Sequence, residues 1–131
     1  MKVDIPLGDV VDKITILRIK RDRLTSPHAL ANVRHELRAL LDAWHDAQLP
    51  RLERLPEWED LVDVNGRLWD VEDALRGHEA RGDFGEAFVA LARSVYKLND
   101  RRAALKRSIN DALGSSFVEE KSYVDWRKPQ E

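Results

Sequence analysis

The residues of this chain that could take part in chemistry are charged and amide side chains that lie on apolar helical stripes. Arg102 lies on the stripe that contains Leu98 and Leu105, and Arg21 continues a stripe near the N-terminus. A guanidinium inside a helix bundle needs a carboxylate or an anionic ligand, because removing an unpaired charge from water is costly. We therefore expect both arginines to face the interior beside an acid or an anion.

Two interpretations of Arg102 stay open. In the first, Arg102 pairs with Glu72, which follows Leu68 by four residues, and the buried pair sets the register of two helices. In the second, Arg102 and Lys13 hold a small carboxylate or phosphate, because guanidinium donors suit planar anions. Glu72 would then act as a general base or orient the cationic groups. The ligand-binding residues of this second hypothesis are Lys13, Asn65, Glu72, Arg102, Glu119, Lys121 and Tyr123, and the catalytic residues stay unknown.

Several other kinds of site are excluded by residue type or spacing. The chain has no cysteine, which excludes disulfides, thiolate nucleophiles and cysteine-ligated metals. Its four histidines form no repeated Glu-x-x-His pattern, no serine lies in a nucleophile elbow, and no glycine-rich phosphate loop is present. The basic run over 97–107 is interrupted by Asp100, so no nucleic-acid partner is expected. We expect neither a metal nor a cofactor.

Four helices must position the candidate residues. Apolar residues recur at steps of three and four between breaks at proline and glycine, which predicts helices over about 7–24, 27–48, 57–80 and 84–113. Ser26 and Pro27 are typical of a helix start. Gly66 costs about 1 kcal/mol inside a helix, but the apolar spacing continues across it, so we expect one continuous third helix.

The predicted fold is all-α, an antiparallel bundle of four helices in a single domain over 1–131, with a long C-terminal helix and an extended tail over 115–131. A helix of thirty residues is about 45 Å long, against about 27 Å for the first helix. Either the N-terminal segment and the tail or a second copy of the chain must cover the excess, and we expect a homodimer.

Charge is divided unevenly between the last two helices. The segment 57–80 carries eight acidic and two basic residues, whereas 84–113 carries six basic and three acidic residues, although the whole chain has a formal charge of only −2. The two helices therefore attract each other, and this attraction favours antiparallel pairing and selects partners. Without a secretory signal or a long apolar run, the chain is expected to be cytoplasmic and not inserted in a membrane.

Four blocks of the chain resemble a family of small bacterial proteins of unknown function, DUF6165. The blocks are IPLGDVVDKITILRIKRDRL at 5–24, VNGRLWDVED at 64–73, LARSVYKLNDRRAALKRSIN at 91–110 and VEEKSY at 118–123. Some members lie near genes for surface-polysaccharide assembly, so the resemblance implies a link to that process. It implies no established activity.

Matching the blocks residue by residue picks out many polar positions as members of the family pattern. These are Asp12, Lys13, Lys20, Asn65, Trp69, Glu72, Asp73, Ser94, Tyr96, Asn99, Asp100, Arg101, Lys106, Asn110, Glu119, Glu120, Lys121, Ser122 and Tyr123. The first block is also distantly similar to the first helix of the all-helical chorismate mutases, which place arginines and a lysine around a dicarboxylate. The later lysine and the later glutamine or glutamate of those enzymes have no counterpart here.

Two functions of different classes follow. The first is a dimeric interaction or adaptor protein, in which the polar blocks set the helix register and the tail contacts the second copy or a protein partner. The second is a small-anion site, for binding or catalysis, within the bundle. The matched helix charges and the missing catalytic constellation favour the first.

Overall fold

The computed structural model describes residues 4–114, and these residues form four α-helices and one short 3-10 helix. The elements are α1 (Leu7–Arg23), α2 (Pro27–Asp46), η1 (Leu52–Arg54), α3 (Trp58–Arg81) and α4 (Glu86–Leu113). The described range contains no strand, and the predicted all-α bundle of four helices is confirmed. Each helix begins and ends within two residues of the expected position. The predicted tail over 115–131 lies outside the described residues.

Local sequence explains where the helices begin and end. The Ser26 hydroxyl accepts a hydrogen bond from the Ala29 amide at 3.4 Å, and Pro27 occupies the first position of α2, where a missing N–H costs nothing. Gly82 ends α3 with φ +64° and Gly114 ends α4 with φ +71°, in the left-handed region that glycine adopts without strain. As expected, α3 continues without a break through Gly66.

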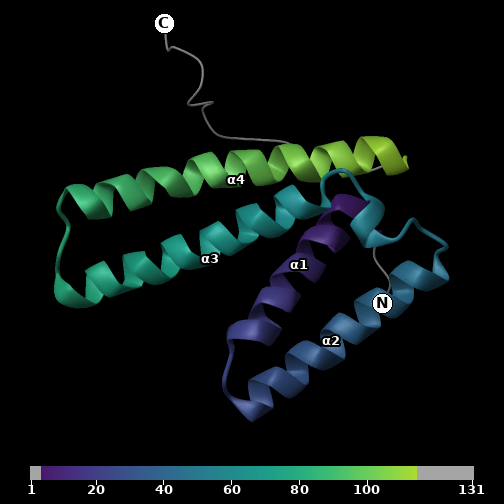
Figure 1. Cartoon of the computed structure of the whole chain (residues 1–131), viewed down its shortest axis with the longest axis horizontal. Helices are drawn as coiled ribbons and strands as arrows, with labels where there is room; N and C mark the ends of the chain where they lie inside the picture. Colours follow the sequence, from purple (N-terminus) through teal and green to yellow (C-terminus); the bar gives the residue numbers. More distant parts are fainter. Residues whose placement is uncertain (1–3, 115–131) are drawn as a thin grey trace, which may run out of the picture.

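The helices form two antiparallel hairpins, α1–α2 and α3–α4 (Figure 1). Helix α1 contacts all three other helices, so it lies between α2 and the α3–α4 hairpin. The oppositely charged helices α3 and α4 do pack on each other, and Arg101 and Asp60 join them at 3.4 Å. Because α1 runs obliquely to α3 and α4, it covers only part of their length (Figure 1).

The apolar core lies where both hairpins meet. Ile14 of α1, Leu61 of α3 and Ile109 of α4 are completely buried in it. The connector between α2 and α3 closes one side of this core, and the Trp44 indole donates a hydrogen bond to the Pro50 carbonyl at 2.7 Å. The first half of α3 and the last half of α4 therefore belong to the core.

The other half of the α3–α4 hairpin is different. We call residues 69–99 the distal half; it comprises the end of α3, the turn and the start of α4. None of its residues is buried, and Phe84, Val89 and Tyr96 are 53%, 49% and 40% exposed. In Figure 1 the hairpin extends well past α1 and α2. The excess length of the last two helices is thus left uncovered by the described residues.

Candidate functional site

Polar side chains join α1 to α4 at three successive levels. The Gly8 amide donates a hydrogen bond to the Asn110 side-chain carbonyl at 2.6 Å, the Lys106 ammonium lies 2.9 Å from the Asp9 carboxylate, and Arg102 binds Asp12. Arg102, Lys106 and Asn110 recur every four residues, which places them on one face of α4. Only the antiparallel register seen here lets all three contacts form together.

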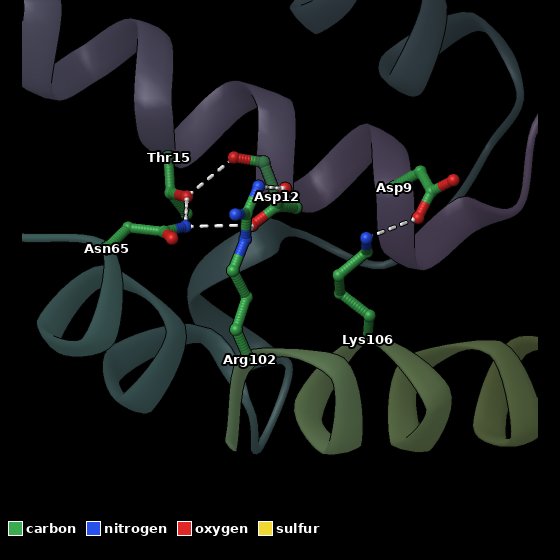
Figure 2. A network of polar contacts seen from close by, with 6 residues as sticks. All are labelled: Asp9, Asp12, Thr15, Asn65, Arg102 and Lys106. Atoms are coloured by element: carbon green, nitrogen blue, oxygen red, sulfur yellow. Dashed lines mark hydrogen bonds and ion pairs between the residues drawn. The ribbon is translucent and has the colours of Figure 1, made fainter. Parts of the chain in front are cut away.

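Asp12 is the centre of this network (Figure 2). Its two carboxylate oxygens accept from the Arg102 Nε at 2.8 Å and from the Arg102 Nη2 at 2.5 Å, a bidentate pair. One of these oxygens also accepts from the Asn65 amide of α3 at 2.9 Å. The same amide nitrogen lies 2.6 Å from the Thr15 hydroxyl, which donates to the Asp12 backbone carbonyl. One carboxylate therefore ties α1 to both helices of the other hairpin.

Gly8 allows α1 to approach α4 at the first level of the network. A Cβ atom at this position would overlap the Lys106 carbonyl oxygen, which belongs to the helix backbone and cannot turn aside. The short Gly8–Asn110 hydrogen bond needs the same close approach. Glycine at position 8 is thus required by packing rather than by backbone conformation.

A cavity of about 380 Å³ opens next to the Asp12 network, between α1, α3 and α4. Its lining combines the polar residues Lys20, Asn65, Glu72, Arg76, Asn99 and Arg102 with the apolar residues Ile16, Ile19, Leu68 and Trp69. The buried Asn65 and the partly buried Arg102 belong to both the network and the cavity, whereas Glu72 and Arg76 are exposed. The cavity volume lies within the range of about 300–1,000 Å³ that small-molecule sites occupy.

Trp69 is oriented at this cavity by a neighbour on α1. The Arg23 guanidinium lies over the Trp69 ring at 5.9 Å from its centroid and also pairs with Asp70. The hydrogen bond to Asp70 raises the pKa of Arg23 above its ordinary value, so the guanidinium stays charged. A planar indole and several cationic groups therefore share one cavity.

The structure brings together three of the predicted ligand-binding residues and separates a fourth. Asn65, Glu72 and Arg102 all line the cavity. Lys13 does not, because it lies on another face of α1 and pairs with Glu36 of α2 at 3.4 Å. Glu119, Lys121 and Tyr123 lie outside the described residues, so their predicted role in closing the pocket stays a prediction.

Two predictions about the arginines were wrong. Arg102 pairs with Asp12 and not with Glu72, which is exposed at the cavity. Arg21 is exposed and contacts its neighbour Asp22 at 3.2 Å, because α1 is ending there and its last turn extends past the core. With Arg21 and Lys13 both outside the cavity, the cation set of the chorismate-mutase likeness is not assembled.

Sequence reasoning missed Asp12 as the partner of Arg102. The predicted stripe of α1 ran through Val10, Ile14 and Leu17, whereas a second stripe of small and polar residues, Gly8, Asp12 and Thr15, faces α3 and α4. Their spacing of four and three was the available signal. It indicates that α1 is covered on two sides, which one apolar stripe does not predict.

The block match picked out Lys20 and Asn99 as polar positions, but sequence reasoning placed neither of them at the cavity, and it missed Arg76 altogether. They come from three different helices, so no local spacing connects them.

Two features are absent from the part of the chain that the structure describes. No group of three or more histidine, aspartate or glutamate residues within 4–114 could hold a metal ion. In the same range, no helix combines the length and the apolar character that a membrane crossing needs.

Comparison with known proteins adds one finding. A family model described as "Family of unknown function (DUF6165)" matches residues 1–128. The chain belongs to the DUF6165 family. This membership confirms the resemblance of the four sequence blocks, and two of these DUF6165 blocks supply the Asp12, Asn65 and Glu72 of the network and cavity. No curated protein and no solved structure matches the chain.

Proposed function

We propose that this DUF6165 member is a cytoplasmic interaction protein that works as a homodimer, and that the distal half of its α3–α4 hairpin is the surface where two copies meet. One observation carries the proposal: none of residues 69–99 is buried, although apolar residues recur through both helices. Helices in proteins gain most of their stability from packing an apolar face. Within the described residues, α1 reaches only the near end of the distal half, at Trp69 and Asp70 and around the cavity, so much of the apolar face of its two helices stays in water.

Apolar side chains at the tip of the hairpin support a protein contact. Phe84 stacks edge-to-face on Phe88 with ring centroids 5.2 Å apart, and Phe84 is still 53% exposed. Val89, the residue after Phe88 in α4, is 49% exposed. Aromatic and aliphatic side chains grouped in this way are typical of the centre of a protein interface.

Charge complementarity favours a second copy as the partner. The end of α3 exposes mainly acids, which include Asp73 and Glu79 besides the Asp70 that pairs with Arg23, and the facing part of α4 exposes the base Arg93. In a two-fold symmetric pair of hairpins, α3 of one copy can lie against α4 of the other, so each acidic helix meets a basic one. A link of this dimer to surface-polysaccharide assembly stays a prediction of the family resemblance.

The experiment is sedimentation velocity on the full chain and on two matched variants. Val89→Asp puts a charge on the proposed interface, and we expect it to convert the dimer to a monomer. Val62→Asp is the control, because Val62 is also an exposed valine of this hairpin, at 38%, but lies in the half that α1 covers. Dimerisation should survive the control and weaken in high salt, since salt screens exposed charges.

Two outcomes would contradict the proposal. One is a full chain that sediments as a monomer at every concentration. The other is equal dimerisation of the Val89→Asp variant and the wild type. A chain that ends at Gly114 tests whether the tail, rather than the distal half, holds the dimer together. If this shortened chain still dimerises, the distal half is supported as the interface. If it is a monomer, the dimer contact is assigned to the tail.

A further inference from the structure

We propose that the cavity between α1, α3 and α4 binds a small organic oxyanion, a carboxylate or a phosphate carried on an apolar or ring-shaped body. The proposal does not rest on dimerisation. It rests on the side chains that three separate helices bring to one cavity, and on which of them already have a partner.

The cations of the cavity differ in how they are neutralised. Arg102 is held in a bidentate pair by the buried Asp12 carboxylate, so its charge is largely compensated. Lys20 and Arg76 also line the cavity, yet neither forms an ion pair with any residue of the described range. Glu72 is the only acid among the described residues of the lining, so these residues carry an excess of positive charge.

Two polar groups of the cavity are held in place by the Asp12 network before any ligand arrives. Asn65 is only 4% exposed, and its amide nitrogen donates to Asp12 and Thr15, which fixes the side chain and leaves only its carbonyl oxygen, an acceptor, for a ligand. Arg102 is fixed by the same carboxylate. Groups that are locked before a ligand arrives lose little entropy on binding. Asn99 of α4 adds a second amide to the lining.

The apolar lining indicates that the ligand is more than a bare inorganic ion. Ile16 and Ile19 of α1, with Leu68 and Trp69 of α3, line the same cavity as the cations. The Arg23 guanidinium lies over one face of the Trp69 indole. A cavity of about 380 Å³ has room for an oxyanion and a ring. The lining thus offers a ligand both charged and apolar contacts.

Glu72 should affect anion affinity in the opposite direction to the cations of the cavity. It lies four residues before Arg76, one helical turn away, and both line the cavity. A simple monoanion is attracted by Arg76 and repelled by Glu72. The two side chains are therefore expected to act on anion affinity in opposite directions, which a merely structural role for either residue would not produce.

The test is NMR titration of the full chain with benzoate, phenyl phosphate and the neutral analogue benzyl alcohol. We expect the two anions, but not the alcohol, to shift the side-chain amide signals of Asn65 and Asn99 and the indole signal of Trp69, with saturation. The affinity ratio of benzoate to phenyl phosphate tells which oxyanion the cavity prefers. Binding of either anion in this selective way supports the proposal.

Variants of exposed or partly exposed cavity residues test the charges without disturbing the core. Lys20→Gln and Arg76→Gln should each weaken anion binding about five- to tenfold, as expected for one charge-assisted contact. Glu72→Gln should strengthen it. Arg34→Gln is the control, because Arg34 is an exposed arginine on α2, which does not line the cavity, and its loss should change nothing.

Four outcomes would overturn the proposal. The first is that neither anion shifts the signals at about 10 mM, roughly ten times a weak Kd of about 1 mM. The second is that benzyl alcohol binds as well as the anions. The third is an unchanged anion affinity in the Lys20→Gln, Arg76→Gln double variant, and the fourth is weaker anion binding in Glu72→Gln. The Val89→Asp variant, monomeric if the proposed dimer is right, should bind the anions like the wild type. A failure of the dimer and a failure of the anion site can therefore be told apart.

Discussion

At the residue scale, the Asp12 carboxylate is the buried group that links α1 to both helices of the other hairpin. It is 5% exposed as a residue, and its oxygens accept from Arg102 and Asn65 on two other helices. A buried acid of this kind is tolerated because its bonds are complete, and it specifies one register of α1 against its neighbours. Arg102 thus meets a buried acid, as expected, but this acid is Asp12 and not Glu72.

Removing Arg102 should be costly because it leaves Asp12 buried without its cation. We expect Arg102→Met to lower the free energy of unfolding by about 3 kcal/mol, and the double variant Asp12→Leu, Arg102→Met to recover most of that loss, since apolar side chains can replace a buried pair. The measurement is the urea midpoint.

The control for this variant is Arg38→Met. Arg38 is 79% exposed and pairs with Asp42 at 3.7 Å on the surface of α2, so its loss should cost at most about 0.5 kcal/mol. If Arg102→Met costs no more than Arg38→Met, the network does not stabilise the fold.

At the element scale, α3 carries two glycines that should respond to alanine in opposite ways. Gly66 lies within the helix, and a Cβ atom there meets nothing within 4 Å. Gly82 ends the same helix with φ +64°, where an L side chain is strained. The first glycine weakens the helix without a packing reason, whereas the second is needed to end it.

We expect Gly66→Ala to raise the free energy of unfolding by about 0.5–1 kcal/mol, because alanine loses less backbone entropy in a helix. Gly82→Ala should lower it by about 1–2 kcal/mol, the cost of a left-handed alanine. Thermal unfolding followed by circular dichroism measures both. A destabilising Gly66→Ala would mean that the backbone at residue 66 is approached by something beyond the described residues.

At the scale of the whole molecule, burial divides the α3–α4 hairpin into two unequal parts. All buried residues of α3 lie at or before Leu68, and all those of α4 lie at or after Asp100. The part packed on α1 and the distal half should therefore open with different free energies.

Hydrogen exchange at two protein concentrations tests this division. Amides of 69–99 should exchange faster than those of 58–68 and 100–113 in dilute solution, and they should become protected as the concentration rises and the proposed dimer forms. Exchange in 69–99 that is slow and independent of concentration would show that the distal half is covered within one chain.

The sequence by itself determined the four helices and their ends. Apolar residues at steps of three and four, with Pro27, Gly82 and Gly114 at the boundaries, depend only on local backbone preferences, and these survive in any tertiary arrangement. The opposite charges of α3 and α4 likewise predicted that these helices attract. The sequence also singled out Asn65, Glu72 and Arg102, which line the cavity, because polar side chains that face a bundle interior need a partner.

Only the tertiary structure decided which acid meets Arg102 and which way Lys13 points. Helical phase gives the face of one helix, but the partner depends on the crossing and register of two, and α1 is covered on two sides rather than one. Asp12 and Glu72 are both acids near the right phase, and the backbone approach that Gly8 allows brings Asp12 to Arg102. The cavity, too, exists only because three helices converge there.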